Sequence, residues 1–194
     1  MASLEIYGRT GDFTAKFLRH AEIKHGRVAM AAFVGYCVQS NFHFPWPMTL
    51  SGEPFPSTDL SPPEQWDALP YGSKLQIIGL IGFLEIYSEL TPTDSSKSAL
   101  PHYTSAEGVP GKFPEFGDIP HPVPFNLFDP FKLSANKSEE AKARGLVVET
   151  NNGRLAQIGI LGFLAADKVD GAVPALTGIA KPYAGDVMAP VSDS

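Results

Sequence analysis

A short segment near the start of the chain returns later in nearly the same form, and this repeat constrains the fold more than any other feature. The first copy reads Glu22-Ile-Lys-His25-Gly-Arg27-Val-Ala-Met30, and the second reads Glu149-Thr-Asn-Asn152-Gly-Arg154-Leu-Ala-Gln157. The register continues beyond the segment, because Gly35 aligns with Gly162. An internal repeat of this kind defines the architecture before any local pattern does. We therefore expect two helices that form a pseudo-twofold pair.

The spacing within each copy predicts ion pairs between the two helices. Residues three apart share one face of a helix, so Glu22 lies beside His25. The arginine five positions after each glutamate is turned about 140° away and cannot easily pair on its own helix. If the helices cross, Arg27 can reach Glu149 and Arg154 can reach Glu22, which gives each buried carboxylate the cation it needs. Each carboxylate then keeps a free oxygen that can bind a ligand.

Small residues recur along both helices where such a crossing is expected. They repeat every three positions, as Ala29, Ala32 and Gly35 in the first helix and as Ala156, Gly159 and Gly162 in the second. Small side chains let two helix backbones approach each other in lipid. We expect the helices to cross at these positions.

The paired segments resemble the first-helix and third-helix signatures of the light-harvesting chlorophyll-binding superfamily. The form ExxHGRxAM with a later ExNNGRLA is most similar to chlorophyll a/c-binding antennae of algae with secondary plastids, of the dinoflagellate peridinin type or the diatom fucoxanthin type. The resemblance covers roughly residues 13 to 180. It implies an all-α membrane protein with three transmembrane helices, which binds chlorophyll a, chlorophyll c and carotenoids and catalyses no reaction.

Composition limits the other classes. The net charge of −6 argues against a nucleic-acid partner, and the single Cys37 excludes an internal disulfide framework. No run of about 18 uninterrupted apolar residues exists, so hydropathy alone indicates a soluble protein. Under the resemblance, paired Glu and Arg residues inside the spans explain the weak hydropathy signal. No transit peptide precedes the first helix, so we expect a processed or truncated form of a plastid protein.

The chain reads as one domain over residues 1–194. Periodic apolar positions and helix breakers predict helices over about 13–40, 71–90 and 138–168, followed by a tail over 169–194. Residues 41–70 hold seven prolines and no Lys or Arg, which predicts an ordered, non-helical loop. Five Lys or Arg residues lie in residues 1–27, and four more lie at the start of the third helix, so the positive-inside rule places the N-termini of both helices on one side. In a thylakoid that side would be the stroma.

The resemblance assigns roles to polar residues of the helices. It implies that the magnesium of chlorophyll is bound by Glu22, His25, Glu149 and Asn152, and further by Gln76 and Glu85. Gln157 departs from the methionine usual at this place in the family, and it is a candidate to bind a chlorophyll or a carotenoid end group. Arg27 and Arg154 would be the structural partners of the glutamates. Plant-type relatives carry an arginine three residues after the equivalent of Glu85, where this chain has Ser88, so a water or a backbone N–H is the expected partner there. Further axial-ligand candidates lie near helix ends or in loops, namely His20, Gln39, His43 and His121.

Each assignment competes with a plainer interpretation. A glutamate can be a surface carboxylate or a structural ion pair, a lone histidine is usually a satisfied core residue, and an arginine can extend to the lipid interface. The segment Phe128-Asp129-Pro130-Phe131-Lys132-Leu133 resembles the family's FDPLGL sequence, which implies that Asp129 and Pro130 help to seat a carotenoid. Peridinin, fucoxanthin and diadinoxanthin-type carotenoids are the candidates. Lys132 replaces the family's glycine.

The function expected from the resemblance is a light-harvesting antenna in the plastid thylakoid membrane. Its partners would be a photosystem core, neighbouring antenna subunits and thylakoid lipids. A photoprotective, energy-dissipating member of the same superfamily is the nearest alternative. A di-iron carboxylate protein is a remote one, because Glu22-x-x-His25 has the Glu-x-x-His form of four-helix di-iron bundles. Against it, the second copy replaces the histidine, and each copy brings an arginine that would repel iron.

Overall fold

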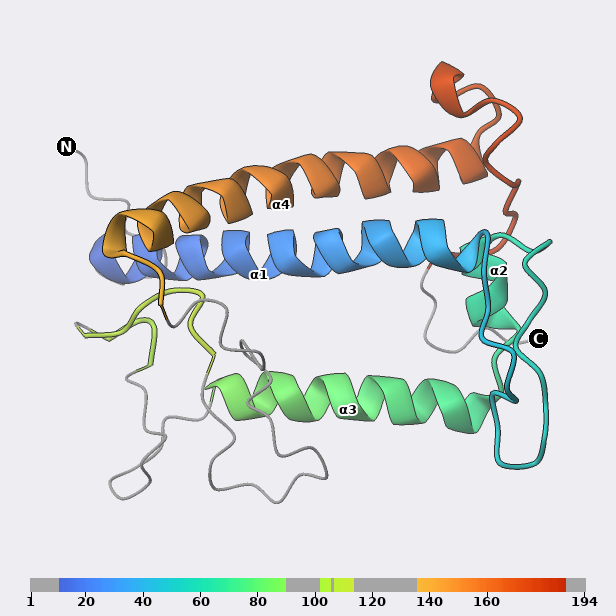
Figure 1. Cartoon of the computed structure of the whole chain (residues 1–194), viewed down its shortest axis with the longest axis horizontal. Coiled ribbons are helices and arrows are strands. Elements are labelled where there is room, and N and C mark those ends of the chain that lie inside the picture. Colours follow the sequence, from blue (N-terminus) through green and yellow to red (C-terminus); the bar gives the residue numbers. More distant parts are fainter. Residues whose placement is uncertain (1–10, 90–101, 106, 114–135, 188–194) are drawn as a thin grey trace. The chain divides into compact units, whose positions relative to one another are not determined.

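The computed structural model describes residues 11–89, 102–105, 107–113 and 136–187, and in these ranges the chain is helical with no strand. Three long helices dominate it, α1 (Gly11–Gln39), α3 (Tyr71–Glu89) and α4 (Glu139–Lys168) (Figure 1). A short helix, α2 (Pro62–Asp67), and a 3-10 helix, η1 (Pro174–Leu176), complete the set. The predicted all-α class is confirmed. The long helices begin and end within two residues of the expected ranges.

The ends of the long helices follow from local hydrogen bonding. Ser138 precedes α4, and its hydroxyl accepts a hydrogen bond from the backbone N–H of Ala141 at 3.3 Å, as a helix N-cap does. At the other end, Gly171 takes a positive φ of 75°, a conformation that favours glycine and stops a helix. The end of α1 is capped by Asn41, whose side-chain amide donates to the carbonyl of Cys37 at 2.8 Å.

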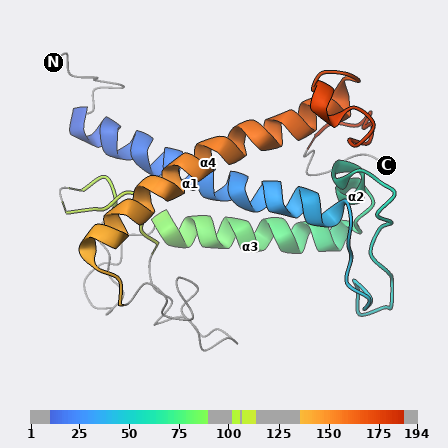
Figure 2. The ribbon, with the colours of Figure 1, turned by 45° about the horizontal axis from the view of Figure 1, so that its top comes forward.

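The prediction of a non-helical loop over residues 41–70 is wrong for Pro62–Asp67, which form α2. Ser61 and Glu64 make a reciprocal capping box, in which each side chain binds the other residue's backbone N–H. Pro62 lies in the first turn, where a missing N–H costs nothing. The sequence Ser-Pro-Pro-Glu carries this signature. Prolines favour a loop in most positions, but they are compatible with a helix in its first turn, where Pro62 and Pro63 lie. Both views show α2 beside the C-terminal end of α1 (Figures 1 and 2).

Many large apolar side chains on the three long helices are exposed. More than half of the residue surface is accessible at Val34, Leu80, Ile86, Ile158 and Leu161. The three helices contain 29, 19 and 30 residues. Among the helices that the structure describes, none contains a stretch both long and apolar enough to count as a candidate membrane span.

The chain divides into two compact units. The first comprises Met1–Arg27 with Ile81–Asn152, and the second comprises Val28–Leu80 with Gly153–Ser194. Each long helix contributes one part to each unit.

In the second unit, aromatic side chains join α1 to α4. The rings of Tyr36 and Phe163 stack with centroids 4.5 Å apart, and Phe33 lies 5.1 Å from Phe163. A Cβ added to Gly159 would meet the Phe33 ring at 2.8 Å, so the close approach expected of this glycine is present. At Gly35, by contrast, a Cβ would meet open space, as it would at Gly162. These two glycines therefore do not provide the close approach that we expected.

The tail returns to the helices of the second unit through buried polar groups. Tyr183 is only 4% exposed, and its hydroxyl donates to Asp67 Oδ2 at 2.8 Å. Its backbone N–H donates to the carbonyl of Asp167 at 2.9 Å, and Asp167 in turn accepts from the Tyr36 hydroxyl. Burial, together with the carboxylate of Asp67, raises the pKa of Tyr183 to about 12. These contacts tie Tyr183 of the tail to α2 and α4, and Asp167 in turn ties α4 to α1.

Candidate functional site

The first unit contains one of the two cross-helix ion pairs that the repeat predicts. Arg27 Nε on α1 donates to Glu149 Oε1 on α4 at 2.6 Å. The Glu149 side chain is 28% exposed, and within the described residues its second oxygen, Oε2, has no hydrogen-bond partner. The site therefore holds a neutralised carboxylate with one free oxygen. The second predicted pair, between Arg154 and Glu22, joins residues of different units and stays a prediction.

Arg27 is oriented by a backbone carbonyl as well as by Glu149. Its Nη1 donates to the carbonyl of Gly111, and the N–H of Gly111 donates to His20 Nδ1 at 3.1 Å. Gly111 has a φ of 82°, and a Cβ there would meet Ile23 side-chain atoms at 2.9 Å. Two side chains of α1 thus hold both polar groups of this glycine, where only glycine fits without strain. The sequence Pro110-Gly111 predicts a turn with a positive φ at the glycine, but it contains no signal for the contacts with His20 and Arg27.

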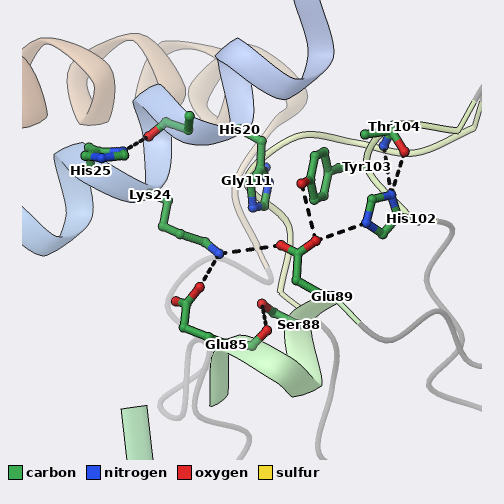
Figure 3. Close-up of polar contacts among 11 residues, drawn as sticks. His20, Lys24, His25, Glu85, Ser88, Glu89, His102, Tyr103, Thr104 and Gly111 are labelled. Carbon is green, nitrogen blue, oxygen red and sulfur yellow. Dashed lines mark hydrogen bonds and ion pairs between the residues drawn. The ribbon is translucent and has the colours of Figure 1, made fainter. Parts of the chain in front are cut away.

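Residues 102–105 also contact α1 (Figure 3). The Tyr103 ring stacks on His20 with centroids 3.8 Å apart, and Lys16 Nζ donates to the carbonyl of Ser105 at 2.6 Å. Because His20 Nδ1 accepts a backbone N–H, the neutral ring carries its proton on Nε2, which is buried and unpartnered among the described residues. Neither ring nitrogen offers a free lone pair, so the structure contradicts His20 as an axial ligand.

His25 has the opposite arrangement. Its Nδ1 lies 2.7 Å from the carbonyl oxygen of Ala21 on the preceding turn (Figure 3). A carbonyl only accepts, so the proton is on Nδ1, and Nε2 keeps the lone pair that a metal requires. His25 is exposed, and nearby Glu22 accepts a hydrogen bond from Arg19 Nη1 at 2.6 Å. The geometry therefore suits His25 as a ligand through Nε2.

Glu85 has a partner that we did not predict. Lys24 Nζ on α1 lies 2.6 Å from Glu85 Oε2, within the first unit (Figure 3). The hydroxyl of Ser88 donates to the backbone carbonyl of Glu85 and does not satisfy the carboxylate. The expected water or backbone N–H is thus replaced by an ammonium group from another helix.

The other candidates lie in less defined surroundings. Gln76 lines a cavity of about 460 Å³ in the second unit, together with Gln39 and aromatic residues such as Trp66. Asn152 is exposed on α4, and Gln157 is half-buried further along the same helix. His43 Nε2 lies 3.0 Å from the Gln65 side-chain oxygen, so it already has a hydrogen-bond partner. The predicted positions outside the described residues are Asp129, Pro130 and His121.

The di-iron alternative called for carboxylates and histidines gathered around one point. Within the part of the chain that the structure describes, no group of three or more His, Cys, Asp or Glu side chains is placed to hold a metal ion. The arrangement that does occur is different. Glu149, Glu85 and His25 each offer one unshared ligand atom, and each atom belongs to a separate position.

Comparison with known proteins gives consistent matches. The family described as "Chlorophyll A-B binding protein" matches residues 4–168. A fucoxanthin-chlorophyll a-c binding protein of Trieres chinensis is 30% identical over 168 residues, covering 81% of this chain and 68% of the relative. Fucoxanthin-chlorophyll a-c binding protein F of Macrocystis pyrifera is 31% identical over 78% of this chain and 61% of its own length. Protein F of Phaeodactylum tricornutum is 33% identical, with coverages of 78% and 65%. The chain thus spans about two thirds of the length of these relatives.

Proposed function

We propose a light-harvesting role for this chain, which belongs to the chlorophyll A-B binding protein family. It binds chlorophyll a, chlorophyll c and carotenoids and passes excitation energy to a photosystem. The observation that carries the proposal is the Arg27–Glu149 pair, because it provides a charge-neutralised carboxylate with a free oxygen on a helix face. The repeat makes the equivalent pair of Arg154 with Glu22 part of the same proposal.

The residues fit the coordination chemistry of chlorophyll. Magnesium is a hard cation that takes oxygen ligands, and the free oxygens of Glu149 and Glu85 meet this requirement. His25 offers the lone pair of Nε2, oriented by the Ala21 carbonyl in the way that outer-shell partners orient metal-binding histidines. The remaining proposed chlorophyll ligands are Glu22, Gln76, Asn152 and Gln157. When bound, chlorophyll supplies light absorption, and the protein fixes its position and orientation.

We place α1, α3 and α4 across a plastid thylakoid membrane, with the N-terminus in the stroma. Two features support this placement. Exposed Val34, Leu80, Ile158 and other large apolar side chains on the long helices would face lipid or pigment. Five Lys or Arg residues precede Val28, whereas residues 41–70 contain none, as the positive-inside rule requires for opposite sides.

The relatives bear on the choice of carotenoid and partner. They are fucoxanthin-chlorophyll a-c binding proteins, so fucoxanthin becomes the preferred carotenoid over peridinin, with a diadinoxanthin-type carotenoid in addition. Asp129 and Pro130 remain the proposed carotenoid seat. The proposed partners are a photosystem core, neighbouring antenna subunits and thylakoid lipids, and the proposed role involves no catalysis.

An absorption and fluorescence-excitation spectrum of the protein from its native membrane, in mild detergent, tests this function. We expect chlorophyll a bands, a chlorophyll c shoulder in the Soret region and chlorophyll emission sensitised by the carotenoid. Bound pigment with strongly quenched emission would indicate energy dissipation instead. A colourless protein would refute both functions. In the same assay, His25→Leu should remove one chlorophyll and leave the others bound.

A further inference from the structure

We infer that Lys24 of α1 is the positioning residue for a chlorophyll on Glu85 of α3, in place of an arginine on α3 itself. The inference rests on the proposed function, in which Glu85 binds magnesium. In plant-type relatives an arginine three residues further along is the expected partner, but here that position is Ser88. The cation comes instead from a different helix, 61 residues away in the chain.

The contact geometry supports this assignment (Figure 3). Lys24 Nζ lies 2.6 Å from Glu85 Oε2 and 3.7 Å from Glu89 Oε1. Glu85 Oε1 has no partner among the described residues, so it is the oxygen that can bind magnesium. The ammonium therefore neutralises the carboxylate through one oxygen and leaves the other available.

Glu89 lies one helical turn after Glu85 and competes for the same ammonium group. It has other partners, because His102 Nε2 lies 3.2 Å from Glu89 Oε2 and the Tyr103 hydroxyl donates to the same oxygen at 3.3 Å. Tyr103 is fixed in turn by its stacking on His20. These contacts satisfy one oxygen of Glu89 without Lys24. Lys24 lies nearer to Glu85, at 2.6 Å, than to the other oxygen of Glu89, at 3.7 Å.

If a pigment covers Glu85, the ion pair of Lys24 with Glu85 contributes strongly to pigment binding. The Glu85 side chain is 51% exposed in the protein alone, and an ion pair so exposed contributes little in water. A chlorophyll ring over Glu85 would exclude that water, and an uncompensated carboxylate under it would be strongly disfavoured. Lys24 therefore matters for pigment binding much more than for folding. A lysine is a compact charge on a flexible stem and can follow the carboxylate as the pigment binds.

Reconstitution of the full chain with extracted pigments tests this assignment. Glu85→Val identifies the chlorophyll that depends on Glu85, by pigment stoichiometry and the difference absorption spectrum. We expect Lys24→Met to lose that same chlorophyll, and Lys24→Arg to retain it. The double variant Lys24→Met with Glu85→Gln should bind it again, because an amide ligand is neutral and needs no cation. Lys142→Met, which breaks only the exposed pair with Glu139, is the control and should keep all pigments.

The outcomes separate the two proposals. If Glu85→Val loses no chlorophyll, the ligand role of Glu85 fails, and the role of Lys24 fails with it. If Glu85→Val loses one but Lys24→Met keeps it, the ligand role stands and only the inference about Lys24 is refuted. If Lys24→Met loses it and Glu85→Gln does not restore it, Lys24 acts by packing and not by charge. Circular dichroism shows whether each variant retains its helices, and the restored double variant is itself evidence of a folded protein.

Discussion

Replacing Arg27 by methionine should remove the chlorophyll held by Glu149 on the other helix while leaving the fold almost unchanged. Arg27 makes two charge-assisted contacts, one to Glu149 Oε1 and one to the carbonyl of Gly111. Methionine keeps most of the length and apolar surface of the arginine side chain and removes both donors. The substitution therefore tests the charge of Arg27 more than its packing.

The expected size of the effect differs between the empty and the pigment-bound protein. The Arg27 and Glu149 side chains are 40% and 28% exposed, so in water their pair contributes only about 0.5 kcal/mol. A bound chlorophyll would cover Glu149, and removal of one partner of a buried pair costs about 3 kcal/mol. That amount corresponds to about a hundredfold weaker binding. The melting temperature should move little, whereas one chlorophyll should be lost.

Reconstitution followed by pigment analysis measures this loss. Arg27→Met and Glu149→Val should lose the same chlorophyll, and the double variant should lose no more than either single one. Arg144→Met, on an exposed part of α4, serves as the matched control and should keep every pigment. If Arg27→Met instead removes only the chlorophyll that Glu22→Val removes, Arg27 supports its own helix and the cross-helix assignment is wrong.

Three further substitutions test the framework around the sites. Gly111→Ala should destabilise the protein by about 2 kcal/mol, because alanine is strained at a φ of 82° and meets a side chain of α1, and thermal melting measures the loss. Tyr183→Phe should cost about 1.5 kcal/mol in denaturant unfolding, because Asp67 loses a buried donor. Tyr71→Phe, at an exposed tyrosine, is the control for this substitution and should cost almost nothing. Burial raises the pKa of Tyr183 above its unfolded value of 10 to about 12. The contribution of the Tyr183 hydroxyl to the free energy of unfolding is therefore full below pH 10 and is lost as the pH approaches 12. Ser61→Ala should remove the capping box of α2 at a cost of about 1 kcal/mol, visible as a lower denaturation midpoint.

The sequence was most informative where the structure depends on regular spacing. Apolar periodicity and breakers such as Pro45 and Gly171 indicated the three long helices, because helix formation depends on neighbours a few residues away. The pair between Arg27 and Glu149 followed from two short motifs, since a five-residue separation turns the arginine away from its own glutamate. The capping residues Ser61 and Glu64 also predict α2, although the prolines between them favour a non-helical loop when taken alone.

Periodic patterns in the sequence do not predict the contacts that irregular segments make. Tyr183 meets Asp67, and Gly111 meets both His20 and Arg27, although no periodic pattern links these positions. Their partners lie 84 to 116 residues away, and the connecting segments have no repeating geometry from which a distance could be worked out. The pair Pro110-Gly111 does predict a turn with a positive φ at the glycine, and the N–H of Lys112 closes this turn on the carbonyl of Val109 at 3.3 Å. Only the structure shows which side chains this turn contacts.

Glu85 shows how the two kinds of information combine. The sequence identified a carboxylate in an apolar helix without the expected arginine, which is a physical problem because a covered charge needs a counter-charge. It could not say which cation solves that problem, since Lys24 belongs to another helix and to no repeated motif. The structure supplies the cation, which lies 2.6 Å from Glu85 and 3.7 Å from Glu89, and the other oxygen of Glu89 binds His102 and Tyr103. The absence of the expected arginine therefore predicts that another part of the chain supplies a cation, and the tertiary contacts identify it as Lys24.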